Sequence, residues 1–120
     1  MASGVSKLSP HIAESDWKVF RVLSPIALDR FCERVLAEIA RECAAPGKSN
    51  HERYLAVFRL MQARDKELAA AFDGCSRSGA VRQLARIQSL GLLTDEEMAR
   101  FSPQTRQAAQ PLNLEIPGPE

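Results

Sequence analysis

The sequence lacks most of the patterns that mark an enzyme or a metalloprotein. Its six glycines are scattered and form neither GxGxxG nor GxxxxGK[ST], so no phosphate-binding loop is recognisable. There is no CxxC, HExxH or EF-hand pattern, and the only histidines are His11 and His51. These absences predict no cofactor and no metal ligands, and they leave catalysis without an evident set of residues, which favours a non-enzymatic role.

The chain also lacks a charge excess and a long apolar run. Sixteen Lys and Arg residues against 15 Asp and Glu residues give a net charge of +1, so no global field points to nucleic acid or to a membrane surface. No segment approaches the roughly 20 apolar residues that span a bilayer. The beginning, MASGVSKLSP, has no apolar core of a secretory signal. We therefore expect a cytoplasmic protein with no membrane partner.

The three cysteines, an odd number, argue against a disulfide framework. Cys32 and Cys43 fall in one expected helix, where a rise of about 1.5 Å per residue separates them by roughly 16 Å, too far for a bond. We expect these cysteines, with Cys75, to behave as small buried apolar residues. A zinc site built from His51, Cys43 and Cys75 would lack the closely spaced ligand pairs of structural zinc sites.

What the sequence does contain is apolar residues at helical spacing. Residues 24–45 predict a helix in which Ser24 caps, Pro25 takes the first position and Pro46-Gly47 ends the run. Its apolar stripe consists of Leu28, Phe31, Cys32, Val35, Leu36, Ile39 and Cys43. Residues 15–23 suit a short helix capped by Ser15, with Trp17, Phe20 and Leu23 inward, but their alternation also suits a strand.

Further helices are predicted downstream. One begins at Ser49 or Asn50 and ends near Asp73, and another covers 80–90 and stops at Gly91. Thr94 and Glu97 have the spacing of a capping box, and Ser102-Pro103 begins one more short piece. The short loops predict an all-α antiparallel bundle of four to five helices over residues 15–110, with a flexible segment at 1–14 and an extended Pro-rich tail at 111–120.

One carboxylate interrupts the apolar side of the helix over 49–73. At about 100° per residue, Asp65 falls among Tyr54, Val57, Phe58, Met61, Leu68 and Phe72. An unpaired charge on a core face is costly, so Asp65 is expected either to take an arginine or an amide in a gap between helices, or to line a pocket for a ligand or partner. Candidate residues for such a pocket are His51, Arg53, Tyr54, Arg64 and Asp65.

A second candidate surface is basic. Residues 74–93 contain Arg77, Arg82 and Arg86 and no acidic residue, and a local positive stripe of this kind suits a phosphate backbone. Arg82 and Arg86 are four residues apart and share one helix face. A face of solvated charges without any partner explains the same pattern.

The segment RQLARIQSLGLLTDEEMARF, residues 82–101, resembles the SHOCT family, the short C-terminal helical domain. The resemblance lies in Leu84 and Ile87, the run from Gly91 to Glu97, then Met98 and Phe101, and it covers about a sixth of the chain. Its position before the C-terminus and the absence of a lysine-rich ending depart from the family. The resemblance implies a helix–turn–helix hairpin with a role in oligomerisation or partner binding.

The sequence therefore predicts a small soluble helical module for protein–protein interaction or oligomerisation. Five phenylalanines, one tryptophan and broad apolar stripes exceed what a short bundle buries, so we expect an exposed apolar patch and a homodimer. Two alternatives stay open: a nucleic-acid-binding regulator that uses Arg77, Arg82 and Arg86, and a small-ligand-binding protein with a pocket around Asp65.

Overall fold

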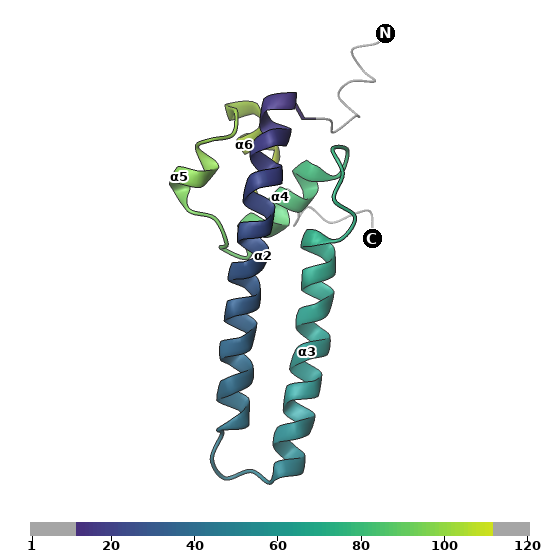
Figure 1. Cartoon of the computed structure of the whole chain (residues 1–120), viewed down its shortest axis with the longest axis vertical. Coiled ribbons are helices and arrows are strands. Elements are labelled where there is room, and N and C mark those ends of the chain that lie inside the picture. Colours follow the sequence, from purple (N-terminus) through teal and green to yellow (C-terminus); the bar gives the residue numbers. More distant parts are fainter. Residues whose placement is uncertain (1–11, 112–120) are drawn as a thin grey trace.

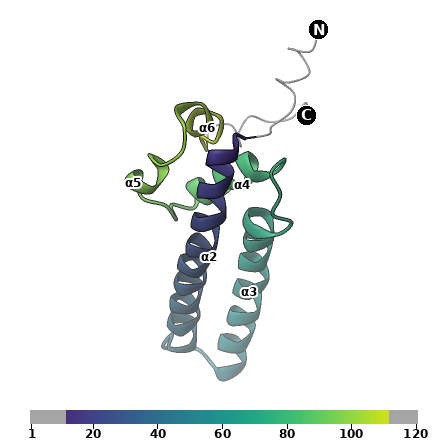
Figure 2. The same ribbon diagram turned by 45° about the horizontal axis from the view of Figure 1, so that its top comes forward.

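The computed structural model describes residues 12–111, and all regular structure within that range is helical. The helices are α2 (Glu14–Cys43), α3 (Asn50–Phe72), α4 (Ala80–Ser89), α5 (Asp95–Met98) and α6 (Pro103–Ala108). The long helices α2 and α3 run side by side in opposite directions, and α4, α5 and α6 gather at the N-terminal half of α2 (Figures 1 and 2). The all-α prediction is confirmed. The expectations for residues 1–11 and 112–120 lie outside the described residues, but the flexible segment expected at 1–14 is wrong for residues 12–14, because Ile12 is buried in the core and Glu14 begins α2.

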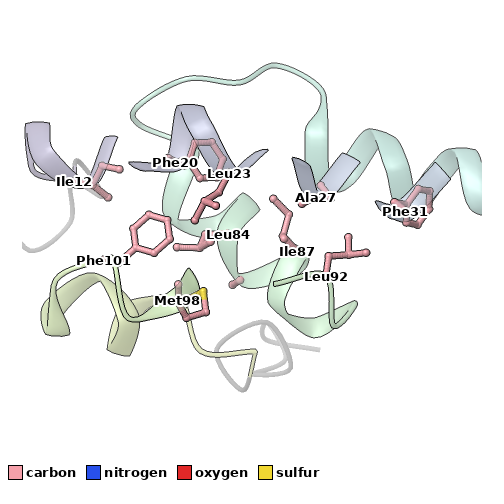
Figure 3. Close-up of a cluster of buried hydrophobic side chains, with 14 of the residues drawn as sticks. Ile12, Phe20, Leu23, Ala27, Phe31, Leu84, Ile87, Leu92, Met98 and Phe101 are labelled. Atoms are coloured by element: carbon pink, nitrogen blue, oxygen red, sulfur yellow. The ribbon is translucent and has the colours of Figure 1, made fainter. Parts of the chain in front are cut away.

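Helix α2 passes through the predicted break at Ser24-Pro25, so that prediction is wrong. Pro25 lies inside α2, on its exposed side, where water can solvate the carbonyl that the missing proline N–H leaves free. Buried residues continue every three or four positions across the proline: Phe20, Leu23, Ala27 and Phe31 (Figure 3). Burial of this stripe outweighs the local stop signal.

The start of α2 also differs from the sequence prediction. Ala13 precedes the first helical residue, Glu14, and no side chain caps this end, so Ser15 is not the N-cap. Of the residues expected to point inward, Phe20 and Leu23 are buried and Trp17 is half-buried. Residues 15–23 are therefore helix and not strand.

The hydrophobic core lies at one end of the molecule. It joins the N-terminal half of α2 to the segment after residue 79, with contacts among Ile12, Phe20, Leu23, Leu84, Ile87, Leu92, Met98 and Phe101 (Figure 3). From α3 only Ala71, near its end, is buried among the described residues. Most apolar residues of α3 therefore lie away from this core.

The predicted helix boundaries in the second half of the chain are confirmed. Ser49 and Glu52 form a capping box at α3, Thr94 and Glu97 form one at α5, and Ser102 caps α6. Helix α4 ends where Gly91 takes a φ of 68°, a conformation that suits glycine. The N–H groups of Gly91 and Leu92 donate to the carbonyls of Gln88 and Ile87, which satisfies carbonyls that the helix end would otherwise leave free.

Glu97 also joins α5 to α2. Its carboxylate accepts two hydrogen bonds from Arg30, at 2.7 and 2.9 Å, and one of 2.8 Å from the Thr94 N–H. The hydrogen bonds from Arg30, then that from Thr94, lower the pKa of Glu97 from 4.5 to about 2 against a smaller opposing effect of burial. A lowered carboxyl pKa means that the folded state favours the ionised form.

We therefore expect Glu97→Gln to lower the free energy of unfolding at neutral pH by about 1–2 kcal/mol. The expected loss of unfolding free energy is modest because the Arg30 side chain is 37% exposed and solvent screens the ion pair. The contribution is complete above about pH 5 and is lost as pH falls from 4.5 toward 2, so the two proteins should converge in acid. Urea denaturation across this pH range measures it. Glu96→Gln, a change at an exposed neighbour, is the control, and a pH-independent difference would contradict the ion-pair explanation.

Candidate protein-interaction surface

The loop-side part of the α2–α3 hairpin, residues 31–68, extends away from the core, and we call it the arm (Figure 1). At its inner end Phe31 and Val35 still belong to the core. The molecule measures 63 × 36 × 21 Å and has a radius of gyration of 17.6 Å. A compact domain of 100 residues has a radius of gyration of about 13 Å. In both ribbon views no other helix runs beside the arm (Figures 1 and 2).

Helical spacing gives α3 a second apolar side in addition to the side that meets α2. Val57 and Arg64 are half-buried, and Arg64 reaches Glu38 of α2, which places this side against α2. The residues that follow them directly, Phe58 and Asp65, are turned by about 100° out of the helix pair. Apolar residues on that turned side are not required for packing within the hairpin.

Helix α2 shows the same pattern, in which a more exposed residue directly follows a buried residue that faces the other helix. Phe31 and Val35 are buried, whereas Cys32 is half-buried and Leu36 is 64% exposed. Because the two helices are antiparallel, the turn from one residue to the next brings these side chains to the same side of the hairpin as Phe58. We call this side the apolar face and define it by Cys32, Leu36, Ile39, Tyr54, Phe58, Met61 and Leu68.

The apolar face is both exposed and hollowed. Tyr54, Phe58 and Met61 are 67%, 51% and 47% exposed. Between the helices lies a groove of about 270 Å³ whose lining includes Leu36, Ile39, Met61 and Leu68. Contiguous patches of large exposed apolar side chains are typical of association surfaces. Leu36 was predicted in the core, and its exposure corrects that expectation.

The opposite side of the arm is polar. Arg64 donates to both oxygens of Glu38, at 2.8 and 2.9 Å, and to Glu67 at 3.2 Å. The hydrogen bond from Arg64 lowers the pKa of Glu38, and the one to Glu38 raises the pKa of Arg64. A hollow of about 460 Å³ here is lined by Arg34, Arg41 and this pair, and toward the core also by Phe31, Val35 and Leu90. The arm therefore presents one apolar and one charged side.

Asp65 does not lie in the core, and the expectation of a buried carboxylate is wrong. The helical wheel was right that Asp65 shares a side with Tyr54, Phe58 and Met61, but that side faces outward. Asp65 lines the apolar groove and is exposed, and within residues 12–111 no side chain pairs with it. Neither an internal ion pair nor an enclosed pocket accounts for it.

The other candidates for a pocket around Asp65 do not converge. Arg64 lines the groove but is held by Glu38 and Glu67. Arg53 donates to the Ala45 carbonyl at 2.9 Å and to Asn50, which fastens the loop between α2 and α3. His51 is exposed at the start of α3, and Tyr54 lies on the apolar face outside the groove lining.

The three arginines of the candidate nucleic-acid surface have different environments. Arg77 donates to Glu14 at 2.8 Å and to the Ile12 carbonyl at 3.1 Å, so it fastens the turn before α4 to the start of α2. Arg82 is exposed and Arg86 is half-buried. Because Arg77 is used within the fold, two arginines remain for a phosphate backbone, which weakens this alternative.

The cysteines are less buried than expected. Cys32 and Cys43 share α2 as predicted, and Cys32 is half-buried. Cys43 and Cys75 are exposed, so the expectation of buried cysteines is wrong for Cys43 and Cys75. Cys43 and Cys75 lie at a helix end and in a turn, where few side chains surround them. Across residues 12–111, no group of three or more His, Cys, Asp or Glu side chains is arranged to hold a metal ion.

The sequence interpretation missed one buried carboxylate, Asp16, which is 3% exposed. It accepts hydrogen bonds from the N–H and hydroxyl of Ser102, at 2.8 and 2.7 Å, and from the Thr105 hydroxyl at 2.7 Å. Burial raises its pKa, but these hydrogen bonds together outweigh burial and lower it. The signal was present, because Asp16 precedes Phe20 and Leu23 at helical spacing and so shares their buried side.

We compared the chain with protein-family models, with curated protein sequences and with solved structures, and none of the three gave a match. The resemblance of residues 82–101 to the SHOCT family therefore stays a prediction. The segment holds α4, a tight turn at Gly91 and the short α5. Among the described helices, none combines the length and the apolar character that a membrane crossing requires.

Proposed function

We propose that this chain is a protein-interaction module that binds an apolar helical surface of another protein molecule on its apolar face. The observation that carries the proposal is the contrast between the two sides of the arm. Charged residues are paired across one side, whereas the other exposes Leu36, Tyr54, Phe58 and Met61. Intramolecular packing does not explain four large apolar side chains in solvent.

The predicted antiparallel bundle fits this proposal. Within the described chain only the core end has a third helix packed on α2 and α3, and the arm is a helix pair. A helix pair buries one side of each helix, and a four-helix bundle buries two sides at about 90° to each other. Helices of the bound protein would supply the missing neighbours of the arm.

Site-specific photocrosslinking in living cells tests the proposal. A photoreactive residue at Phe58 is expected to give a covalent protein adduct, whereas the same residue at Ala63, which is exposed on the other side of α3, is not. The two positions are only five residues apart in one helix, so a difference between their adducts shows which side of α3 contacts the bound protein. Equal adducts at both positions, or none at Phe58, would overturn the proposed function.

A further inference from the structure

The apolar face changes in shape along the arm. Near the loop, Tyr54 and Phe58 project and are 67% and 51% exposed. Farther from the loop, the face is hollowed by the groove between Leu36 and Leu68. Met61 stands at the boundary, since it is 47% exposed and also lines the groove. The face therefore carries a ridge on one side of Met61 and a groove on the other.

We propose that the apolar face binds the same face of a second copy of this chain, with the two arms antiparallel and a twofold axis near Met61. This inference rests on the proposed function and names the partner. A twofold axis there brings residue 54 to the level of residue 68 of the partner and residue 58 to that of residue 64. Each ridge then lies at the level of the other copy's groove, as an isologous interface requires.

The alternative with parallel arms is unfavourable for two reasons. It would oppose ridge to ridge and groove to groove, so the surfaces would meet at Tyr54 and leave a void along the grooves. It would also place Asp65 of both copies at the same level of an apolar interface, where like charges repel. The antiparallel arrangement avoids both.

The antiparallel arrangement also gives Asp65 a counter-charge. It places Asp65 at the level of residue 57 of the partner, close to the partner's Arg59. Arg59 is exposed, and no acidic side chain within residues 12–111 pairs with it. Arg59 is turned by about 100° from Phe58, so it lies at the outer edge of the apolar face, and its long side chain, which leans toward the N-terminus of its helix, extends from that edge toward the level of the opposing carboxylate. Two such pairs, one on each side of the axis, form in the dimer.

The size of the face suits a second copy better than a single foreign helix. Along the arm, α3 runs from residue 50 to residue 68, which is about 28 Å, and two helices are about 20 Å wide. The resulting area of about 570 Å² is about seven-tenths of the roughly 800 Å² per partner of a standard interface. A single helix in the groove would leave Tyr54 and Phe58 in solvent, whereas a second arm covers ridge and groove together and completes a four-helix bundle.

Disulfide trapping tests the arrangement in the full-length chain, with Cys32, Cys43 and Cys75 replaced by alanine. Met61→Cys is expected to form a disulfide-linked dimer on mild oxidation, because it lies near the axis and faces its own copy. Tyr54→Cys and Leu68→Cys are each expected to stay largely unlinked. When these two variants are mixed and allowed to exchange subunits before oxidation, they should link to one another.

Ala63→Cys, at nearly the same level but on the opposite side of α3, is the matched control and should not link. Linking of Tyr54→Cys and of Leu68→Cys each with itself would show parallel arms and overturn the proposal. A Met61→Cys protein that stays monomeric would also overturn it. In that case, a Phe58 photoadduct with a different protein would leave the proposed function standing, whereas no adduct would remove both.

Discussion

Replacing Asp16 by alanine is expected to lower the free energy of unfolding by about 3 kcal/mol. The carboxylate is buried and accepts three hydrogen bonds, two from Ser102 and one from Thr105. Its removal leaves a backbone N–H and two hydroxyl groups without their acceptor, and hydrogen bonds to charged groups contribute about 1.5–3 kcal/mol each before relaxation. The loss is a large part of the 5–15 kcal/mol that stabilises a typical domain.

Asp16→Asn removes the negative charge of the side chain but keeps nearly the same shape. One amide oxygen remains for the Ser102 N–H, so we expect a smaller loss of about 1–2 kcal/mol. Glu14→Ala, two residues earlier and at an exposed ion pair with Arg77, is the control and should cost less than about 1 kcal/mol. Urea denaturation at low protein concentration and neutral pH measures all three. A loss below about 1 kcal/mol for Asp16→Ala would show that α6 does not depend on this carboxylate.

The sequence predicted the helices well where local signals define their ends. Thr94 and Ser102 cap the helices whose starts they were expected to mark, and of the two starts expected for α3, Ser49 is the cap and Asn50 the first helical residue. The signals failed at Ser24-Pro25, because a capping pattern describes only a few residues, whereas α2 is held by burial of a stripe that spans the proline. Tertiary packing routinely overrides such local preferences.

The candidate site was predicted in part. Periodicity correctly placed Asp65 on one side of α3 with Tyr54, Phe58 and Met61, but periodicity gives no information on whether that side meets the core or solvent. The distinction depends on which other helices pack against α3. The described chain has none beside the arm, so a stripe that resembles a core face is instead a surface. The expectation of an exposed apolar patch is confirmed by the same residues.

Phe58→Asp is expected to convert a dimer of the 13.3 kDa chain into a monomer. In the proposed dimer Phe58 is covered by the partner's groove, so aspartate would place a charge in an apolar interface twice, once for each copy. Loss of an aromatic anchor at an interface commonly costs about 2 kcal/mol or more, and two such losses raise the Kd by roughly 1,000-fold. Sedimentation equilibrium over a range of concentrations measures the Kd.

The same substitution should leave the folded chain intact, and this separates loss of association from loss of structure. Phe58 is 51% exposed and lies outside the core, so the helical circular dichroism of the variant should persist at concentrations where it is monomeric. Ala63→Asp, which adds the same charge to the polar side of α3, should keep the Kd of the unsubstituted protein. Two results would show that the apolar face does not bind a second copy. One is an unsubstituted protein that stays monomeric at high micromolar concentration, and the other is an unchanged Kd for Phe58→Asp.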